Sequence, residues 1–267
     1  MIEEVKIYFT GKELYGDKFT LEEIEKWYKD EEEAYATMYG NEVSPDNFDY
    51  TNFDILFGYK NIPIKKYNKV LGFGASWGYE FLPIIKQIES LSIIESSDKT
   101  VSEKLGNITP FYIKANVCGK IDIENNTYDL ITSFSVLHHI PNVSFVVSEL
   151  FRVLKKDGYL LIREPINSMG DWRRERENLT SHERGIPRKY FNNIIASLNC
   201  KEIKISYHYF MYNFLNRKLH SPKFLRSKWY LRLDEILSRL FLWNYHYHPK
   251  NMFQRIAPSY VYYIIKK

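Results

Sequence analysis

Arginine residues gather in one short polar stretch of this sequence. Residues 171–188 read "DWRRERENLTSHERGIPR", in a chain that is otherwise richer in lysine. The five arginines of this stretch are Arg173, Arg174, Arg176, Arg184 and Arg188. A guanidinium group donates two parallel hydrogen bonds, so arginine is preferred over lysine where a carboxylate or phosphate must be held in a fixed orientation. The stretch is therefore a candidate anion-binding segment. The alternative is a solvated helix whose arginines pair with Glu175, Glu177 and Glu183.

Three histidines are candidates for proton transfer. His138 and His139 are adjacent in "SVLHHIPN", and His182 lies in "LTSHERGIP". Imidazole titrates near neutral pH, which makes histidine well suited to act as a general base toward a hydroxyl group. An alternative of equal weight is that one member of the adjacent pair caps the following helix or packs beneath it. A single loop histidine such as His182 is more often only solvated.

A glycine-rich turn precedes a candidate ligand-binding acid. The segment "VLGFGASWG" (70–78) places Gly72, Gly74 and Gly78 at the end of a predicted strand. Glycine there permits a tight turn and a close approach of the backbone to a ligand. Glu95 ends the next predicted strand and is placed to accept hydrogen bonds from both ribose hydroxyls of an adenine nucleoside. An exposed acid at a strand end is the alternative for Glu95, and the glycine turn favours the ligand.

The elements that must position these residues alternate along the chain. Short apolar runs alternate with helical patterns from residue 67 to residue 163, which predicts parallel β-α-β units and an α/β fold. Further strands are predicted over 201–210 and 259–267. Residues 1–59 are expected to form an N-terminal helical extension or lid. Residues 60–267 then form the main domain, with a helical insertion at about 213–256 before the last strand.

The insertion has an amphipathic pattern. It holds nine lysines and arginines against Asp234 and Glu235. Its apolar stripe at helical spacing consists of Leu225, Trp229, Leu233, Ile236, Leu237 and Leu240. Most such stripes pack on their own domain or on a second subunit. A basic amphipathic helix can also lie on an anionic membrane, so both readings stay open.

The ordered motifs resemble those of class I S-adenosylmethionine (SAM) dependent methyltransferases, from about Lys69 to Pro165. The segment 70–78 is similar to the first motif of that family, and Glu95 to its ribose-binding acid. "KANVCGKIDIENNTYDLITSFSVLHHIPN" resembles the third and fourth motifs, and "ELFRVLKKDGYLLIREP" the segment that leads into the fifth strand. The resemblance implies a Rossmann-like sheet of seven strands, mostly parallel with an antiparallel last strand, and helices on both faces. It also implies SAM as cofactor and S-adenosylhomocysteine (SAH) as product.

The resemblance implies a set of cofactor-binding residues. They are Gly72, Gly74, Ala75, Ser76, Glu95, Ser96, Asn116, Val117 and Ser133. Three of them depart from the family pattern. Gly72 stands where an acid usually helps to orient the SAM ammonium group, and Ser76 replaces a motif glycine. Asn116 replaces an aspartate at the adenine, although its amide oxygen still accepts a hydrogen bond. A tyrosine or acid of the N-terminal helix, such as Tyr35 or Tyr39, is expected to compensate for Gly72.

The acceptor is expected beyond the fifth strand, because ligands of open α/β sheets bind at the carboxyl edge. The candidate substrate-binding residues are Arg163, Glu164, Arg173, Arg174 and Arg176, with His138 or His139 as the preferred base and His182 as the third candidate. They favour O-methylation of a small anion: a phosphorylated, nucleotide-linked or acidic sugar. "REPINSMGDWR" together with "LTSHERGIP" also looks like bacterial methyltransferases of surface-polysaccharide biosynthesis.

Two rival functions remain. "GFGASWG" also reads as a loose dinucleotide motif, typical of an NAD(P)-dependent oxidoreductase. However, the Tyr-x-x-x-Lys sequence of this chain, Tyr8 to Lys12, precedes the cofactor domain. The departures at Gly72 and Ser76 also fit a non-catalytic SAM-binding scaffold. The asparagine-proline-proline-aromatic motif of DNA amino-methylating enzymes is absent, with "SFSV" in its place.

The composition of the chain bears on whether it binds nucleic acid, metal or membrane. The net charge of +4 is too small to indicate nucleic acid. Cys118 and Cys200 fit no metal-ligand spacing, so we expect neither a metal site nor a disulfide framework. No signal peptide or membrane-spanning run is present, which predicts a cytoplasmic protein, at most peripheral to the inner face of the membrane. The oligomeric state is not indicated.

Overall fold

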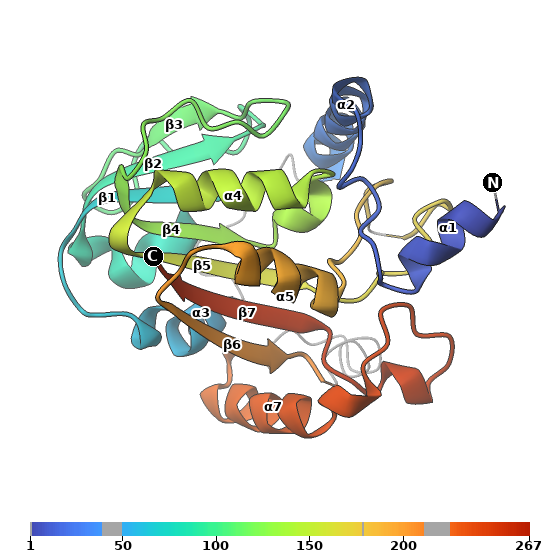
Figure 1. The fold of residues 1–267 in the computed structure, drawn as a ribbon. Coiled ribbons are helices and arrows are strands. Elements are labelled where there is room, and N and C mark those ends of the chain that lie inside the picture. Colours follow the sequence, from blue (N-terminus) through green and yellow to red (C-terminus); the bar gives the residue numbers. More distant parts are fainter. Residues whose placement is uncertain (1, 39–49, 178, 211–224) are drawn as a thin grey trace.

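The computed structural model describes residues 2–38, 50–177, 179–210 and 225–267. Their centre is one seven-stranded sheet in the order β3-β2-β1-β4-β5-β7-β6 (Figure 1). The strands are β1 (Tyr67–Phe73), β2 (Ile88–Glu95), β3 (Phe111–Lys114), β4 (Tyr128–Phe134), β5 (Leu154–Pro165), β6 (Glu202–His208) and β7 (Tyr260–Lys266). The pairs from β3 to β5 are parallel, and β7 runs antiparallel to both of its neighbours. This architecture confirms the α/β prediction.

Helices cover both faces of the sheet. On one face, α4 (Val143–Val153) and α5 (Arg188–Ser197) pack against an aliphatic core. The other face carries α3 (Thr51–Phe57), the 3-10 helix η3 (Tyr79–Gln87) and the buried side of α7 (Lys228–Leu240). Nearly all residues of β4 and the second half of β5 are buried, as expected for strands that are covered on both faces.

The topology determines where a ligand can bind. The chain turns in opposite directions on leaving β1 and β4, because β2 lies on one side of β1 and β4 on the other. Open α/β sheets bind ligands at the carboxyl ends of the strands at such a switch point. The residues that directly follow β1, β2 and β4 are therefore neighbours at one edge of the sheet. Gly74 and Ser96 are among them.

Two N-terminal helices lie outside the sheet. They are α1 (Ile2–Phe9) and α2 (Leu21–Met38). Figure 1 shows α2 beyond the carboxyl ends of β2 and β3. Thr20 caps α2, since its backbone amide and hydroxyl both donate to Glu23 and the Glu23 amide returns a bond to the hydroxyl. Both helices belong to the segment for which a helical extension was predicted, and α2 stands over the edge where ligands bind.

Two sequence patterns have an unexpected form in the structure. The helical pattern of "YEFLPIIKQIES" (79–90) is a 3-10 helix that ends at Gln87, and β2 already begins at Ile88. Pro83 lies inside this segment, and proline lacks the amide that an α-helix needs at that position. The apolar stripe of the insertion does not pack as a whole on its own domain: Leu225 is buried, but Trp229, Ile236 and Leu240 are exposed. Residues 213–224 of the insertion lie outside the described residues.

Candidate functional site

One cavity opens at the predicted edge of the sheet. Its walls come from the ends of β1, β2, β3 and β4, and from α2. Including the part that is open to solvent, it encloses about 970 Å³. Cofactor sites are typically concave and mostly apolar, with a few polar groups, and this cavity combines apolar side chains with the carboxylates of Glu31, Glu32 and Glu95.

The glycine turn brings backbone to this cavity. Gly74 lines it with φ +65°, a left-handed conformation that favours glycine. A Cβ at Gly74 would lie 2.5 Å from Val136 Cγ1, so the close approach of the loop after β4 also requires glycine here. The departure at Gly72 has a steric reason, because a Cβ there would lie 2.8 Å from the ring of Phe81. An acid at position 72 has no room in this chain.

Glu95 presents a fixed carboxylate at the cavity wall. Its Oε2 accepts a hydrogen bond from the Ser76 amide at 2.9 Å. Its Oε1 accepts bonds from the amides of Ser96 at 2.8 Å and Ser97 at 3.3 Å. The side chain is buried yet lines the cavity. These bonds come from the glycine turn and from the end of β2, so they lock the two motifs together and hold the carboxylate in one orientation.

The other predicted cofactor residues divide into two groups. Ser96, Asn116 and Val117 line the cavity with Gly74 and Glu95. The other four residues are not part of its wall, so they can affect cofactor binding only through neighbouring residues. They are Gly72, Ala75, Ser76 and Ser133. Asn116 accepts the Cys118 amide at 3.0 Å with its side-chain oxygen. Tyr39 and the side chain of Tyr35 lie outside the described residues.

The helix α2 supplies cavity residues that the sequence patterns did not reveal. Trp27, Tyr28, Glu31 and Glu32 all line the cavity. The indole of Trp27 donates to the carbonyl oxygen of His139 at 2.7 Å, which ties α2 to the turn after β4. The acids of α2 are so numerous that composition alone does not distinguish Glu31 and Glu32 from a solvated face. Trp27 and Glu31 are four residues apart and therefore lie on the same face of the helix. This spacing was the sequence signal that could have marked the face of α2 that meets the cavity.

His138 is held between two carboxylates. Its Nδ1 lies 2.7 Å from Glu164 Oε2, and its Nε2 lies 3.3 Å from Glu183 Oε1. Burial alone would lower the pKa of His138, but the two carboxylates raise it to about 9. Glu164 also accepts the amides of Val136 and Leu137, both at 2.8 Å. This arrangement favours a positioning role for His138, because an imidazolium has no lone pair that can accept a proton. Glu164 likewise shapes the turn after β4.

His139 faces the cavity and pairs with an acid of α2. Its Nδ1 lies 2.8 Å from Glu31 Oε2, and both residues line the cavity. Burial would raise the pKa of Glu31, but hydrogen bonds from His139, Thr180 and the His182 amide lower it. An ionised Glu31 at Nδ1 favours the tautomer that carries the proton there, as in other acid-histidine pairs. His182 packs against Trp27 and bonds Asp30 at 2.9 Å, and it is not part of the cavity wall.

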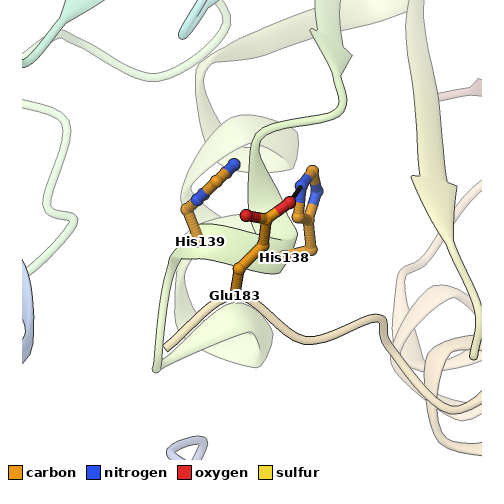
Figure 2. A group of neighbouring side chains, drawn as sticks. All are labelled: His138, His139 and Glu183. Atoms are coloured by element: carbon orange, nitrogen blue, oxygen red, sulfur yellow. Dashed lines mark ion pairs between the residues drawn. The ribbon is translucent and has the colours of Figure 1, made fainter. Parts of the chain in front are cut away.

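Three of these side chains approach each other closely enough to hold a metal ion. Ligand atoms of His138, His139 and Glu183 lie within 4.8 Å of one another, and Figure 2 shows the Glu183 carboxylate between the two imidazoles. Both ring nitrogens of His138 already bind carboxylates, so an ion would have to displace the contact between His138 and Glu183. We therefore interpret the group as an ion-pair network that fixes the turn after β4.

The arginines occupy positions other than those expected. Arg163 is buried on β5 and pairs with Asp54 at 3.1 Å. Arg176 donates to the carbonyl oxygens of Glu183 and Thr180, at 2.6 and 2.8 Å, and Arg184 donates to those of His138 and Ile140. These three arginines hold the protein together instead of reaching the cavity. Figure 1 shows β5, which carries Arg163, in the middle of the sheet.

The two remaining candidates are at the surface. Arg173 makes two hydrogen bonds to Asp171, at 2.8 and 2.7 Å, and the largely exposed Arg174 lies 3.8 Å from the same carboxylate. Arg173 lines a second, open groove, together with Lys6, Lys12, Arg188, Lys189 and Lys250. The predicted cationic character of the arginine stretch is therefore found in this groove and not in the cavity.

We expect the ion pair of Arg163 and Asp54 to act on stability. Burial raises the pKa of Asp54 to about 6, although Arg163 lowers it. Removing one partner leaves a buried unpaired charge, so Asp54→Leu should lower the free energy of unfolding by about 3 kcal/mol. Replacing both residues, with Arg163→Met added, should recover most of this loss. Urea unfolding measures both variants. A stable Arg163→Met variant that has lost only acceptor affinity would instead restore the predicted substrate-binding role.

Comparison with known proteins identifies the fold. Residues 71–162 match the family model described as "Methyltransferase domain". No curated protein matches the chain. A SAM-dependent methyltransferase structure from Leishmania major is 13% identical, with a TM-score of 0.59, and the match covers 94% of this chain and 88% of the other. A SAM-dependent methyltransferase structure from Thermotoga maritima is 11% identical, with a TM-score of 0.50. That match covers 92% of this chain and 99% of the other.

A third similar structure contains ligands. It is phosphoethanolamine N-methyltransferase 1 from Haemonchus contortus, in complex with phosphoethanolamine and SAH. The identity is 15% and the TM-score 0.54, over 95% of this chain and 51% of the other. Identities this low show a shared fold, and the cavity described above lies at the edge of that fold where nucleotide ligands bind.

Proposed function

We propose that this SAM-dependent methyltransferase transfers the methyl group to a hydroxyl oxygen of a small anionic acceptor. One observation carries the proposal. A single cavity is lined both by Gly74 and Glu95 and by the pair of His139 and Glu31. The first two residues suit the nucleoside of SAM, and the pair suits deprotonation of an acceptor.

The residues of the cavity wall favour one orientation of the cofactor. Glu95 at the end of β2 would accept the ribose hydroxyls, and Asn116 and Val117 after β3 would contact the adenine. The methionine end would then lie toward Gly74 and Val136, beneath α2. SAM carries two cationic groups, the sulfonium and the ammonium. The acids in the cavity wall are Glu31, Glu32 and Glu95, against the single cation Lys120, which favours such a ligand.

The chemistry requires alignment and a base. The SAM sulfonium is already an activated methyl donor, so the protein must place the acceptor oxygen in line with the sulfur–methyl bond and exclude water. As the carbon–oxygen bond forms, the carbon–sulfur bond breaks and SAH leaves. The acceptor proton moves to His139, and Glu31 stabilises the resulting imidazolium. The tie between Trp27 and His139 keeps α2 closed over this end of the cavity.

The anionic nature of the acceptor rests on charge. Lys6, Lys12, Arg173, Arg188, Lys189 and Lys250 surround the second groove, where Asp171 is the acid of the lining and is already paired. Rings in successive contact fill the space between this groove and the cavity, from Phe9 through Trp172 and Tyr15 to Trp27. The similar Haemonchus contortus enzyme is named for a small phosphate ester. We extend the proposal to phosphorylated, nucleotide-linked or acidic sugars of surface-polysaccharide biosynthesis.

An acceptor screen tests this proposal. The protein is incubated with SAM and, in turn, a hexose phosphate, a nucleotide-linked sugar, a uronic acid and the neutral hexose, and SAH is quantified by mass spectrometry. We expect SAH to form with one or more of the anions and not with the neutral sugar. Equal rates with the neutral sugar would contradict an anionic acceptor. Tight SAH binding without turnover on any acceptor would favour the non-catalytic scaffold.

Glu31 is expected to replace the acid that is missing at Gly72. A Glu31→Gln variant should bind SAH about tenfold more weakly, because it loses one charge near the ammonium group. It should bind 5′-methylthioadenosine normally, since that nucleoside lacks the amino acid portion. Isothermal titration calorimetry with both ligands measures the difference. Equal losses for the two ligands would place Glu31 away from the methionine end.

A further inference from the structure

The helix α7 presents large apolar side chains to solvent. Trp229 is 75% exposed, Ile236 57% and Leu240 62%. Together with Leu233, they are spaced four, three and four residues apart, so they form one stripe along the helix. Exposed apolar side chains scattered singly are normal, but a contiguous patch of them marks an interaction surface.

The stripe is turned outward by the packing of the opposite side of the helix. Leu231, Asp234 and Ser238 are buried, and at about 100° per residue they lie roughly opposite the stripe. Asp234 accepts the amides of Tyr209 at 2.7 Å and Phe210 at 2.9 Å, which fixes α7 to the end of β6. The apolar face therefore cannot turn inward without breaking these bonds. Figure 1 shows α7 beside β6, at the far end of the sheet from β3.

The apolar surface continues past the helix. Trp243 is 71% exposed, and its ring lies 6.4 Å from that of Phe253, which is 61% exposed. Met252 and Ile256 are exposed as well. We call the exposed apolar residues of α7 and of 243–256 the α7 face. Tryptophan is enriched where a protein meets the boundary between lipid and water, because its ring is apolar and its indole nitrogen is polar.

Most charged residues beside the α7 face are cations. Arg226, Lys228, Arg232, Arg239, Lys250 and Arg255 all belong to this part of the chain. The acids over the same residues are Asp234, which is buried, and Glu235, which lies 3.3 Å from Arg232. A basic flank beside an apolar stripe is the arrangement of helices that lie in the plane of an anionic membrane surface.

We propose that the α7 face docks on an anionic lipid surface. A second copy of the chain is the competing occupant. In a two-fold symmetric dimer the same patch meets itself, so these cations would face the same cations, with only Glu235, already paired with Arg232, to offset them. Anionic lipids offer the missing negative charge in their headgroups, and their acyl chains offer an apolar layer for the two tryptophans. In the part of the chain that the structure describes, no helix is long and apolar enough to cross a bilayer.

Vesicle co-sedimentation tests the proposal. The full chain is mixed with vesicles of phosphatidylcholine alone or of phosphatidylcholine with phosphatidylglycerol. We expect binding to the anionic vesicles, and weaker binding at high salt. The double variant Trp229→Ser/Ile236→Ser should bind at least about tenfold more weakly. The variant Arg232→Gln/Arg239→Gln, which keeps the apolar stripe, should lose about tenfold through charge.

Matched controls separate docking from folding and from dimer formation. Ile64→Ser removes an apolar side chain that is 89% exposed but lies outside the α7 face, so its binding should equal that of the wild type. Thermal unfolding of each variant shows that it is folded. The proposal is overturned if the wild type does not bind anionic vesicles, or if Ile64→Ser loses as much binding as the double variant. It is also overturned if light scattering shows a dimer that Trp229→Ser dissociates.

Discussion

A His139→Gln variant is expected to turn over about 10²–10⁴-fold more slowly than the wild type, with SAH affinity changed only a few-fold. The loss is that of a positioned general base, and glutamine keeps similar bulk without accepting a proton. His139 lines the cavity and bonds Glu31 at 2.8 Å, so its removal leaves the Gly74 and Glu95 side of the cavity intact. Single-turnover measurements with the acceptor found in the screen, together with calorimetry of SAH, give the two quantities separately.

His182→Gln is the matched control for His139. His182 belongs to the same network, but its side chain bonds Asp30 and stacks on Trp27. We expect its effect on turnover to be less than about tenfold, because His182 is not part of the cavity wall and its side chain acts only through residues of α2. Equal losses in the two variants would mean that the network acts by shaping α2. His139 would then not be the base.

Loss of the Glu95 carboxylate is expected to weaken SAH binding at least about 100-fold. Two hydrogen bonds from ribose hydroxyls to an ionised acid each contribute about 1.5–3 kcal/mol, so the Glu95→Ala variant loses a large part of the affinity. The substitution also removes the acceptor of the Ser76 and Ser96 amides, which frees the glycine turn. Calorimetry with SAH measures the change.

Glu89 provides the control on the same strand. It lies near the start of β2, is exposed, and is far along the strand from the cavity. Glu89→Ala should bind SAH as the wild type does. If Glu95→Ala retained wild-type affinity for SAH, the ribose would lie elsewhere and the assignment of the cavity would have to be revised.

The fold could be predicted from the sequence because each of its signals is local. The central strands β4 and β7, and the second half of β5, are buried and appear as nearly continuous apolar runs. The motif resemblance then implied a mostly parallel sheet of seven strands with an antiparallel last strand. The position of Glu95 followed as well, since an acid at the end of the second strand reaches the same edge as the turn after the first.

The arginines could not be placed from the sequence, because their partners are distant in the chain. Arg163 pairs with Asp54, which is 109 residues away, and Arg184 bonds carbonyl oxygens near His138. Nothing in the local pattern distinguishes an arginine that holds a ligand from one that holds backbone carbonyls, because the geometry of donation is the same. The helix α2 posed a similar problem, since its acids have the composition of a solvated face and acquire a role only through contact with the turn after β4.

The apolar stripe of α7 shows a third limit. Helical spacing predicts that one face is apolar, but it does not tell which face packs on the domain. Here the side that carries Leu231, Asp234 and Ser238 is buried. The hydrogen bonds from Tyr209 and Phe210 to Asp234 decide the orientation of the helix, and they join residues about 25 positions apart. A buried acid opposite an exposed tryptophan is the reverse of what hydrophobicity alone predicts.

Calorimetric titration of the purified protein with SAH, with NADH as the control ligand, tests the account most directly. We predict micromolar binding of SAH and no binding of NADH, since the cavity offers Glu95 to a ribose and acids to a cationic amino acid portion. Binding of NADH without SAH would favour the dinucleotide reading of the glycine turn. Failure of both ligands to bind would contradict the assignment of the cavity as a cofactor site.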